Sequence, residues 1–517
     1  MPTVLPVLSP AQSALWDQRA ASAGIAVETL MDAAGRASAA VLAARYGPAL
    51  RGGVLVAAGT GNNGGDGWVL ARTLHRHDVP IWVAALPGTS SPLNAHARTL
   101  ALSEGVREVS PDGPWPAVTL AVDAILGTGA TGVPRGPAAA LVERLRDLRV
   151  PVIALDGPTG VDLLTGAAWG PAGANLSITF GAPRRGHLLA RDEVGDVVVV
   201  DIGLPAADPS WPVLLTDATA AEWLTPFPAT AHKGDRGRVV VVGGEVGMSG
   251  ALRMAGRGAF AAGAGLVFGV APEATTATLA AAEPDLQLRT HPFDRAPSAA
   301  LLELVGQADV GVVGPGLGRG PGRREFLDPL LRAFRTAVLD ADGLVAFQGA
   351  LPVLRELAGR RPLVLTPHPG EFRTLFPHLA GALDVDPWGA AEAAAAETGA
   401  TVLLKGVPSV VARPGCASWT IATGGPGLAT GGSGDILAGI CGAALGAGLP
   451  PDQAAALAAH ALGRAGELAA RRVTPRAMRP MDVIAALPDL WRAWALLRTA
   501  PPRANPPVLF ELGRPTG

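Results

Sequence analysis

The sequence predicts an α/β protein of two domains, each built on a mainly parallel β-sheet flanked by helices. The first observation is length, because 517 residues exceed the roughly 250 to 300 that one hydrophobic core usually supports. The second is the alternation of short apolar runs with longer helical patterns. The third is the placement of glycine turns directly after several predicted strands. Ligands of open α/β sheets bind at such strand ends.

The first domain is expected to contain a doubly wound, Rossmann-like parallel sheet over residues 1–220. Two helices precede the sheet, and the second ends at Gly47-Pro48, a pair that stops helices. Strands and helices then alternate, and this order favours parallel strands. We predict helices at 10–23, 28–46, from about 65, and near 93–104, and strands at 53–58, 80–86, 118–125, 151–156 and 197–200.

The second domain is expected over residues 221–497, followed by a tail at 498–517. The stretch 206–231 lacks sustained periodicity, so we place the boundary within residues 217–230. The tail is rich in proline and shows no pattern, which predicts poor order. Strands are predicted at 237–242, 310–313, 337–340, 362–366 and 401–406.

Composition argues for a small-molecule partner in a reducing compartment. The formal net charge is −2 and no dense basic run occurs, so a nucleic-acid or membrane-surface binder is disfavoured. The N-terminus lacks the pattern of a signal peptide, and the longest apolar stretch, 436–449, is shorter than the roughly 20 residues of a membrane span. The two cysteines, Cys416 and Cys441, cannot form a disulfide framework, and we expect both to be buried. We therefore expect a cytoplasmic protein.

Lysine is almost absent, since the chain contains only Lys233 and Lys405 among its 42 basic residues. A compact ammonium differs from a guanidinium in geometry and hydration. The two surviving lysines are therefore candidates for functional positions.

A first glycine segment, residues 59–67, joins a predicted strand to a helix. It contains G-x-G-x-x-G, which on its own permits a dinucleotide-dependent dehydrogenase. Such an enzyme needs an acidic residue at the end of the second strand, but here that strand ends in Ala85-Leu86-Pro87-Gly88. The adjacent Asn62 and Asn63 instead add amide donors and oxygen ligands to the loop.

Two further strand ends carry an aspartate before a glycine turn, at Asp123 and Asp156. Together with Asn63 and Thr159, Asp123 offers the oxygen ligands that suit an alkali or alkaline-earth cation. No cluster of His and Cys in the sequence suggests zinc.

These segments resemble the YjeF N-terminal domain, the NAD(P)H-hydrate epimerase family, in the runs GNNGGDG, VDAILGTG, ALDGPTGVD and TFGAPRRGHLL, across about residues 10 to 215. The resemblance implies a potassium site at Asn63, Asp123 and Thr159, and Asp156 as the acid–base residue. Thr159 replaces a serine usual in the family and keeps the hydroxyl. The implied substrate-binding residues are Asn62, Asn63, Gly64, Gly65, Asp66, Gly127, Thr128, Gly129, Ala130, Thr131, Gly132, Val133 and Asp156.

A second glycine segment, residues 430–435, precedes an apolar helical run. Backbone amides at a helix start can stabilise a phosphoryl group, and Asp435 could accept a proton from a substrate hydroxyl. No Walker-type motif occurs, and the glycine–Asp arrangement is that of ribokinase-like small-molecule kinases. Lys405 ends a predicted strand where a nucleotide phosphate could bind.

In the order HKGDRGR, GGEVGMSGA, GPGLG, LDADGL, LTPHPGE and TGGSGD, the second half resembles the YjeF C-terminal domain, the ADP/ATP-dependent NAD(P)H-hydrate dehydratase family, across about residues 228 to 490. One departure is Gly425-Pro426-Gly427, where relatives commonly have Asn-Pro-Gly. The resemblance implies that Ala251, Gly318, His368 and Asp435 surround the hydrated cofactor. The implied nucleotide-binding residues are Lys405, Gly406, Val407, Pro408, Ser409 and Gly434.

The two resemblances imply a bifunctional repair enzyme. The first domain would interconvert the R and S hydrates NADHX and NADPHX, and the second would dehydrate the S form at the expense of ADP, or ATP, with K⁺ and Mg²⁺ as cofactors. Two alternatives stay open. The second domain could be a vitamin-precursor or sugar kinase that releases a stable phosphoester, and the first could be a silent binding module. The Gly- and Ala-rich helices would tolerate close subunit packing, so we expect a homo-oligomer.

Overall fold

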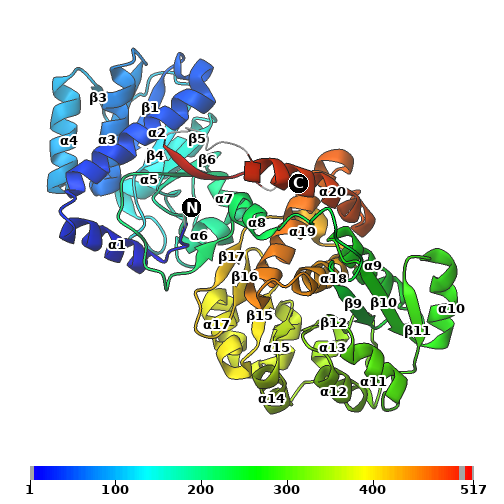
Figure 1. The fold of residues 1–517 in the computed structure, drawn as a ribbon. Coiled ribbons are helices and arrows are strands. Elements are labelled where there is room, and N and C mark those ends of the chain that lie inside the picture. The colour runs from blue at the N-terminus through cyan, green and yellow to red at the C-terminus, as the bar shows by residue number, and fades with distance from the viewer. Residues whose placement is uncertain (1–4, 500–506, 515–517) are drawn as a thin grey trace. The chain divides into compact units, whose positions relative to one another are not determined.

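The computed structural model describes residues 5–499 and 507–514, which form two compact α/β units (Figure 1). Unit 1 contains residues 5–211 together with 507–514, and unit 2 contains residues 212–499. The division therefore lies before the predicted window of 217–230. That window holds helix α8 (Asp217–Trp223), whose first turn is capped by the Thr216 hydroxyl, and α8 belongs to unit 2.

Unit 1 is a doubly wound sheet whose strand order is β18-β7-β6-β5-β4-β1-β2-β3. All neighbouring strands are parallel except β18, and the order 3-2-1-4-5-6 within it is the Rossmann order. One apolar cluster packs α2 and α3 on one face, and another packs α5 on the opposite face. The strands are β1 (Val54–Ala58), β2 (Ile81–Ala85), β3 (Arg107–Val109), β4 (Leu120–Ala124), β5 (Val152–Leu155), β6 (Leu176–Phe180), β7 (Asp196–Val200) and β18 (Val508–Leu512).

Four of the helices of unit 1 were predicted, and three were not. The predicted ones are α1 (Pro10–Ser22), α2 (Val27–Leu50), α3 (Asn62–His75) and α4 (Pro92–Ser103), and the others are α5 (Gly136–Asp147), α6 (Arg185–Leu189) and α7 (Arg191–Val194). Helix α2 does not stop at Gly47-Pro48: it continues to Leu50, with non-helical backbone at Tyr46. Helix α3 was expected from about residue 65, but it begins at Asn62 with Gly61 as its cap. Asn62 and Asn63 therefore form the first helical turn and not a loop.

The expectation of a patternless tail is wrong for residues 508–512. These residues form β18, which pairs antiparallel with β7 and appears as the red arrow beside the sheet of unit 1 (Figure 1). Leu512 is buried, and Glu511 forms an ion pair with Arg45 of α2, with 2.8 Å between Oε2 and Nη2. The alternation of Val508, Phe510 and Leu512 was masked by the surrounding prolines. Residues 500–506 and 515–517 of the predicted tail lie outside the described residues.

Unit 2 has a ten-stranded sheet in the order β11-β10-β9-β12-β13-β14-β15-β16-β17-β8. It is parallel from β11 to β15. Strand β16 pairs antiparallel with both β15 and β17, and β17 pairs parallel with β8. The predicted strands are all present. The strands are β8 (Val213–Leu214), β9 (Arg238–Val242), β10 (Leu266–Ala271), β11 (Gln287–Thr290), β12 (Val310–Val313), β13 (Ala337–Leu339), β14 (Leu363–Leu365), β15 (Thr401–Leu404), β16 (Ser409–Ala412) and β17 (Trp419–Ile421).

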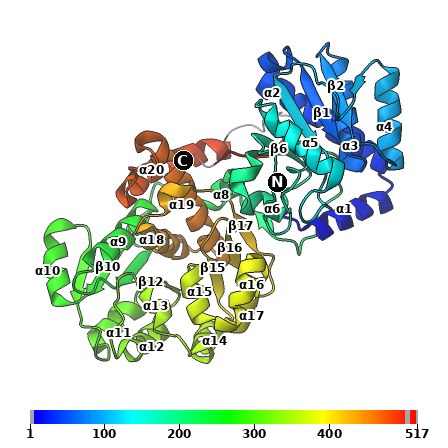
Figure 2. The ribbon, with the colours of Figure 1, turned by 180° about the vertical axis from the view of Figure 1, so that it is seen from behind.

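Helices α9, α18, α19 and α20 bury the main core of unit 2 against this sheet (Figure 2). Helix α18 approaches its neighbours closely because glycine faces them: a methyl group at Gly439 would lie 2.0 Å from the Ala255 carbonyl oxygen. The helices are α9 (Ser249–Ala261), α10 (Glu273–Ala282), α11 (Ala299–Gly306), α12 (Arg323–Ala333), α13 (Asp342–Val345), α14 (Leu351–Arg360), α15 (Pro369–Leu375), α16 (Ala380–Val385), α17 (Pro387–Thr398), α18 (Ser433–Gly446), α19 (Pro451–Val473) and α20 (Pro480–Thr499).

The apolar run at 436–449 lies mostly in α18, a buried helix as predicted. No helix within the described residues is long and apolar enough to cross a membrane. Cys441 is buried, as expected, but Cys416 is exposed in the turn before β17, so that expectation was wrong.

Candidate active sites

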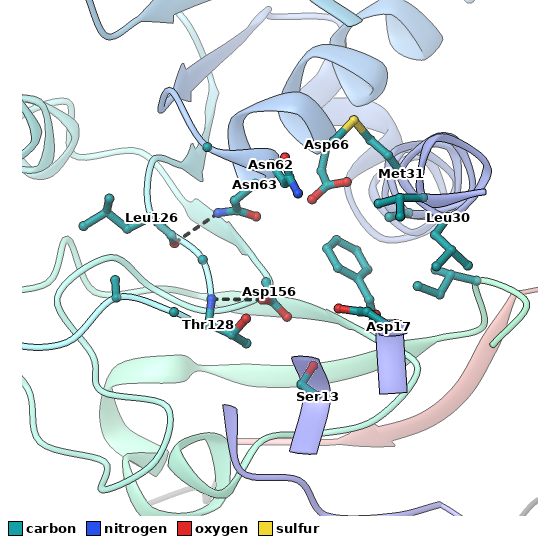
Figure 3. A pocket seen from close by; sticks show the side chains of 18 of the residues that line it. Ser13, Asp17, Leu30, Met31, Asn62, Asn63, Asp66, Leu126, Thr128 and Asp156 are labelled. Atoms are coloured by element: carbon teal, nitrogen blue, oxygen red, sulfur yellow. Dashed lines mark hydrogen bonds between the residues drawn. The ribbon is translucent and has the colours of Figure 1, made fainter. Parts of the chain in front are cut away.

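Unit 1 contains a cavity of about 540 Å³ at the carboxyl edge of its sheet, between the first glycine segment and α1 and α2 (Figure 3). Residues that follow β1, β4 and β5 contribute to its wall, as expected for a doubly wound sheet. Of the predicted site residues, those that line the cavity are Asn62, Asn63, Asp66, Gly127, Thr128, Gly129, Ala130 and Asp156.

Asp156 is held in place by four contacts. Its Oδ2 accepts a hydrogen bond from the Thr128 amide at 3.2 Å, and its Oδ1 lies 3.3 Å from both Thr179 Oγ1 and Arg184 Nη2. Its backbone is left-handed, with φ of 63°, and His187 Nε2 donates to its carbonyl at 2.6 Å. Burial lowers the pKa of His187 to about 4, so this ring is neutral and its Nδ1 accepts the Arg184 amide. A strained aspartate held so firmly in a cavity is typical of a functional residue.

Of the predicted cation ligands, Asp123 and Thr159 contact each other directly, while Asn63 and Thr159 both hydrogen-bond to the Leu126 backbone. Thr159 donates from its amide to Asp123 Oδ2 at 2.8 Å and from its hydroxyl to Asp123 Oδ1 at 2.7 Å. Burial raises the pKa of Asp123, although the Thr159 hydrogen bonds oppose this. Asn63 donates to the Leu126 carbonyl at 3.1 Å, but its Oδ1 is buried and has no hydrogen-bond partner within the described residues. An orphaned oxygen of this kind fits a bound cation.

The remaining predicted residues of unit 1 do not line the cavity. Gly64 and Gly65 pack inward: a methyl group at Gly64 would lie 2.0 Å from the Gly59 carbonyl oxygen, and one at Gly65 would meet Met31. Their lack of a side chain lets α3 approach its neighbours. Thr131, Gly132 and Val133 lie beyond the cavity wall, and Val133 is exposed.

Sequence reasoning missed several side chains of this cavity. Asp17 from α1, Leu30 and Met31 from α2, and Arg184 all line it. Burial, followed by the charges of Asp156 and Asp17, raises the pKa of Asp66 well above its ordinary value. No local signal marked Asp17, because α1 and the strand ends meet only in the folded chain.

In unit 2, the predicted residues converge at the carboxyl edge of β12 to β15 and at the start of α18. Gly432, with φ of 106°, precedes α18, and no side chain caps this helix. Its first amides therefore point toward the strand ends, as in anion sites. The Ser433 hydroxyl is buried and has no hydrogen-bond partner within the described residues.

Asp435 lies in the first turn of α18. Burial, followed by the negative charge of Asp340, raises the pKa of Asp435 to about 7, although Lys405 partly opposes this. A carboxyl group with a pKa near the working pH is suited to exchange protons with a substrate. This supports the role predicted for Asp435.

Lys405 forms ion pairs with two carboxylates in this structure. Its Nζ donates to Asp340 Oδ1 at 2.9 Å and lies 3.6 Å from Glu371 Oε2. Burial would lower the pKa of Lys405, but these two negative charges outweigh it and the pKa is raised. A methyl group at Gly434 would lie 3.6 Å from the same Nζ, so the two predicted nucleotide-binding residues are neighbours. The other lysine, Lys233, is exposed in a turn before β9.

The other predicted residues of unit 2 surround this group. Gly318 donates its amide to Asp342 Oδ2 at 3.0 Å, and Ala251 packs against the same loop after β12. His368 caps α15, accepting the Gly370 amide at 3.0 Å. The turn between β15 and β16 consists of Lys405, Gly406, Val407 and Pro408. Ser409 begins β16, and its hydroxyl accepts the Gly406 amide at 3.1 Å.

The acidic side chains Asp340, Asp342 and Glu371 were present in the predicted motifs but had no assigned role. Asp340 directly follows β13 and accepts the Thr366 hydroxyl at 2.7 Å. Their position after consecutive parallel strands could have marked them, because such positions share one edge of the sheet.

Comparison with known proteins agrees with this division into two units. The family model "YjeF-related protein N-terminus" matches residues 27–186, and the model "NAD(P)H-hydrate dehydratase" matches residues 239–489. The bifunctional NAD(P)H-hydrate repair enzyme of Salinibacter ruber is 39% identical over 508 residues, covering 90% of this chain and 92% of that protein. The corresponding Escherichia coli enzyme is 34% identical, covering 90% and 89%.

Among solved structures, the ADP/ATP-dependent NAD(P)H-hydrate dehydratase of Bacillus subtilis, co-crystallised with ATP and Mg²⁺, is similar at 25% identity and a TM-score of 0.48. The similarity covers 54% of this chain and 97% of the Bacillus subtilis chain. A ribokinase-like protein of Enterococcus faecalis is similar at 26% identity and a TM-score of 0.48, covering 55% and 96%.

The fold and the two sites define a two-domain α/β enzyme, with a Rossmann-like unit followed by a second α/β unit that the dehydratase family model matches. The predicted fold class is confirmed. The relatives match nearly the whole chain, through both units. The chain belongs to the family of bifunctional NAD(P)H-hydrate repair enzymes, with an epimerase and a dehydratase domain.

Proposed function

We propose that unit 2 performs dehydration with Asp435 as its general base. The observation that carries this proposal is the position of Asp435, with its pKa raised to about 7, in the first turn of an uncapped helix. The substrate hydroxyl attacks the terminal phosphoryl group of ADP, or ATP, and Asp435 accepts the hydroxyl proton. The phosphate ester is a better leaving group than hydroxide. Its elimination, with loss of a proton from the neighbouring carbon, restores the dihydronicotinamide.

The nucleotide would lie along Gly434 and residues 406–409. The amides of α18 would stabilise the transferring phosphoryl group, and the unpaired Ser433 hydroxyl is available to it. Mg²⁺ would neutralise the phosphate oxygens when bound. Asp340, Asp342 and Glu371 offer the carboxylate oxygens that suit such a hard cation. Lys405, paired with Asp340 and Glu371, would fix these carboxylates and add positive charge.

Unit 1 would epimerise the hydrate in its cavity, with Asp156 as acid–base residue. Helix α3 begins there without a side-chain cap, so its amides are free to bind the phosphates of a nicotinamide nucleotide. Asn62, Asn63, Asp66 and residues 127–130 would contact the substrate.

Potassium would bind between Asn63, Asp123 and Thr159. The support is the orphaned Asn63 Oδ1, together with the Leu126 backbone that both Asn63 and Thr159 contact. The ion would fix the turns that carry Thr128 and Asp156. We expect replacement of K⁺ by Na⁺ to slow epimerisation and leave S-hydrate dehydration unchanged, and equal loss of both rates would contradict this assignment.

We further propose that the enzyme works in the cytoplasm as a homo-oligomer on NADHX and NADPHX. The nearly neutral charge and the absence of a basic run in the sequence support small-molecule partners rather than nucleic acid or a membrane.

The dehydration proposal is tested by product analysis with S-NADHX, Mg²⁺ and ADP. The wild type is expected to form NADH, AMP and inorganic phosphate in equal amounts, and Asp435→Asn to form none of them. Asp147→Asn, an exposed change in unit 1, is the matched control. Accumulation of a stable phosphoester without NADH would instead identify a small-molecule kinase.

A further inference from the structure

Three carboxyl groups reach into the cavity of unit 1 from three separate elements. Asp17 comes from α1, Asp66 from α3, and Asp156 follows β5 (Figure 3). Helix α1 lies outside the part of the chain that the YjeF family model matches, which begins at residue 27. One wall of the cavity is therefore supplied by a segment to which neither the model nor the sequence motifs assign a role.

Helix α1 is fixed firmly enough to position a side chain. Ser9 and Gln12 form a capping box at its start. Trp16 is buried and donates from Nε1 to the Pro205 carbonyl at 3.0 Å, and Arg19 pairs with Asp208 at 2.7 Å. Asp17 follows Trp16 directly, so these contacts hold its backbone beside the cavity.

The three carboxyl groups have different surroundings. Asp156 is held by Thr128, Thr179 and Arg184, whereas neither Asp17 nor Asp66 makes a side-chain hydrogen bond within the described residues. Partial burial raises the pKa of Asp17; the Asp156 charge adds to this and Arg184 opposes it. Asp66 is buried, but Asp17 is exposed to solvent and can renew its proton between turnovers.

Epimerisation requires acid–base groups on both faces of the reacting carbon. Hydration of the enamine places the hydroxyl on the carbon next to the ring nitrogen. That hydroxyl can leave as water once it is protonated, because the nitrogen lone pair forms a C=N⁺ bond as the C–O bond breaks. Addition of water from the other face, with loss of one proton to a base, gives the opposite epimer. In the reverse direction the acid and the base exchange roles.

We propose that Asp17 is the second acid–base residue of the epimerase, acting with Asp156 in the same cavity. This rests on the function proposed for unit 1. Asp17 donates the proton to the departing hydroxyl, and Asp156 accepts the proton of the incoming water. Solvent then returns both groups to their starting states, so no other reactant is consumed. Asp66 takes no part in the proton transfer and is available to hydrogen-bond with the substrate.

The test uses the full chain, R-NADHX, ADP and Mg²⁺, with NADH formation limited by epimerisation and corrected for the enzyme-free rate. Asp17→Asn keeps the side-chain shape and is expected to lower kcat for epimerisation by about 100-fold or more, with KM changed less than about threefold. Asp17→Glu is expected to restore part of kcat, and Asp147→Asn to match the wild type. In water enriched in ¹⁸O and without ADP, each epimerisation by the wild type is expected to incorporate one ¹⁸O atom into the hydroxyl group of the S hydrate.

Four results would decide against Asp17. These are an unchanged kcat in Asp17→Asn, a loss confined to KM, no recovery in Asp17→Glu, and epimerisation without ¹⁸O incorporation. Dehydration of S-NADHX by the same variant serves as the internal control for a folded, active chain. If the wild type itself fails to epimerise R-NADHX, the proposed function of unit 1 fails rather than the role of Asp17.

Discussion

Asp435 is the residue whose chemistry the structure describes most sharply. Its carboxyl group lies in the first turn of α18, near Asp340 and Lys405, and burial raises its pKa to about 7. A base must be ionised to accept a proton. The ionised fraction of Asp435 grows as the pH rises through this value, so the activity that depends on it grows in the same direction.

We therefore expect kcat/KM for S-hydrate dehydration to fall about tenfold per pH unit below pH 7 and to level off above it. The Asp340 charge is the second cause of the raised pKa, so Asp340→Asn should move the midpoint of the profile to lower pH. Initial rates of NADH formation across this range, corrected for the enzyme-free reaction, measure both. A flat profile in the wild type would remove Asp435 from the proton transfer.

Two glycines near the first cavity have opposite roles, and this can be tested. A methyl group at Gly64 would meet the Gly59 carbonyl oxygen, while one at Gly129 meets nothing within 4 Å. We expect Gly64→Ala to lower the free energy of unfolding by about 2 kcal/mol, because backbone must move. Gly129→Ala should leave stability unchanged and alter KM for the hydrate, since Gly129 lines the cavity. Urea unfolding and epimerase kinetics on both variants measure these effects. A stability loss in Gly129→Ala and a changed KM without a stability loss in Gly64→Ala would contradict the account.

At the scale of elements, patterns that follow local rules could be predicted and pairings between distant segments could not. The strands at Val310–Val313 and Thr401–Leu404 lie where alternation placed them. Strand β10 was missed because its apolar run follows an Ala-rich helix, and a short buried strand resembles a buried helix in sequence. The hairpin of β16 and β17 was missed because no helix separates its strands.

The site residues divide in the same way, into those that local patterns predict and those that only the folded chain brings together. Asn63 and Asp156 follow strands of one sheet and Asp123 lies near the end of β4, so motif and topology both pointed to them. Asp17 lies on a helix that precedes the sheet, and only the folded chain brings it to the cavity. Gly64 belongs to the same motif as Asn63, yet a motif cannot separate a packing glycine from one that contacts a ligand.

Strand β18 completes the sheet of unit 1 although it ends the chain. Its removal would expose the edge of β7 and the pocket of Leu512, and would leave Arg45 without Glu511. We expect a chain ended after residue 499 to lose about 2 kcal/mol or more of stability in unit 1, from one buried leucine and the ladder hydrogen bonds. Epimerase activity should be lost at a lower temperature than in the wild type, while dehydratase activity is retained. A chain ended after residue 514 is the control, and equal thermal inactivation of the two chains would contradict the role of β18.

At the scale of the whole molecule, the two activities belong to separate compact units with separate sites. If the S hydrate leaves unit 1 into solution before unit 2 binds it, the units need not belong to one molecule. A mixture of Asp156→Asn and Asp435→Asn chains is then expected to repair both epimers at a rate comparable with the wild type at equal site concentrations. Failure of the mixture, with each chain retaining its own remaining activity, would show that the intermediate is passed within one chain.

The central claim is that one chain repairs both epimers. It is tested most directly by following NADH absorbance after mixing the protein with R and S NADHX, ADP, Mg²⁺ and K⁺. We predict complete conversion by the wild type and none by Asp435→Asn. Asp156→Asn should stop after the S form, apart from the slow enzyme-free epimerisation. If the wild type forms no NADH with either ADP or ATP, the dehydratase assignment is wrong; if Asp156→Asn converts both epimers as fast as the wild type, the epimerase site is wrongly placed.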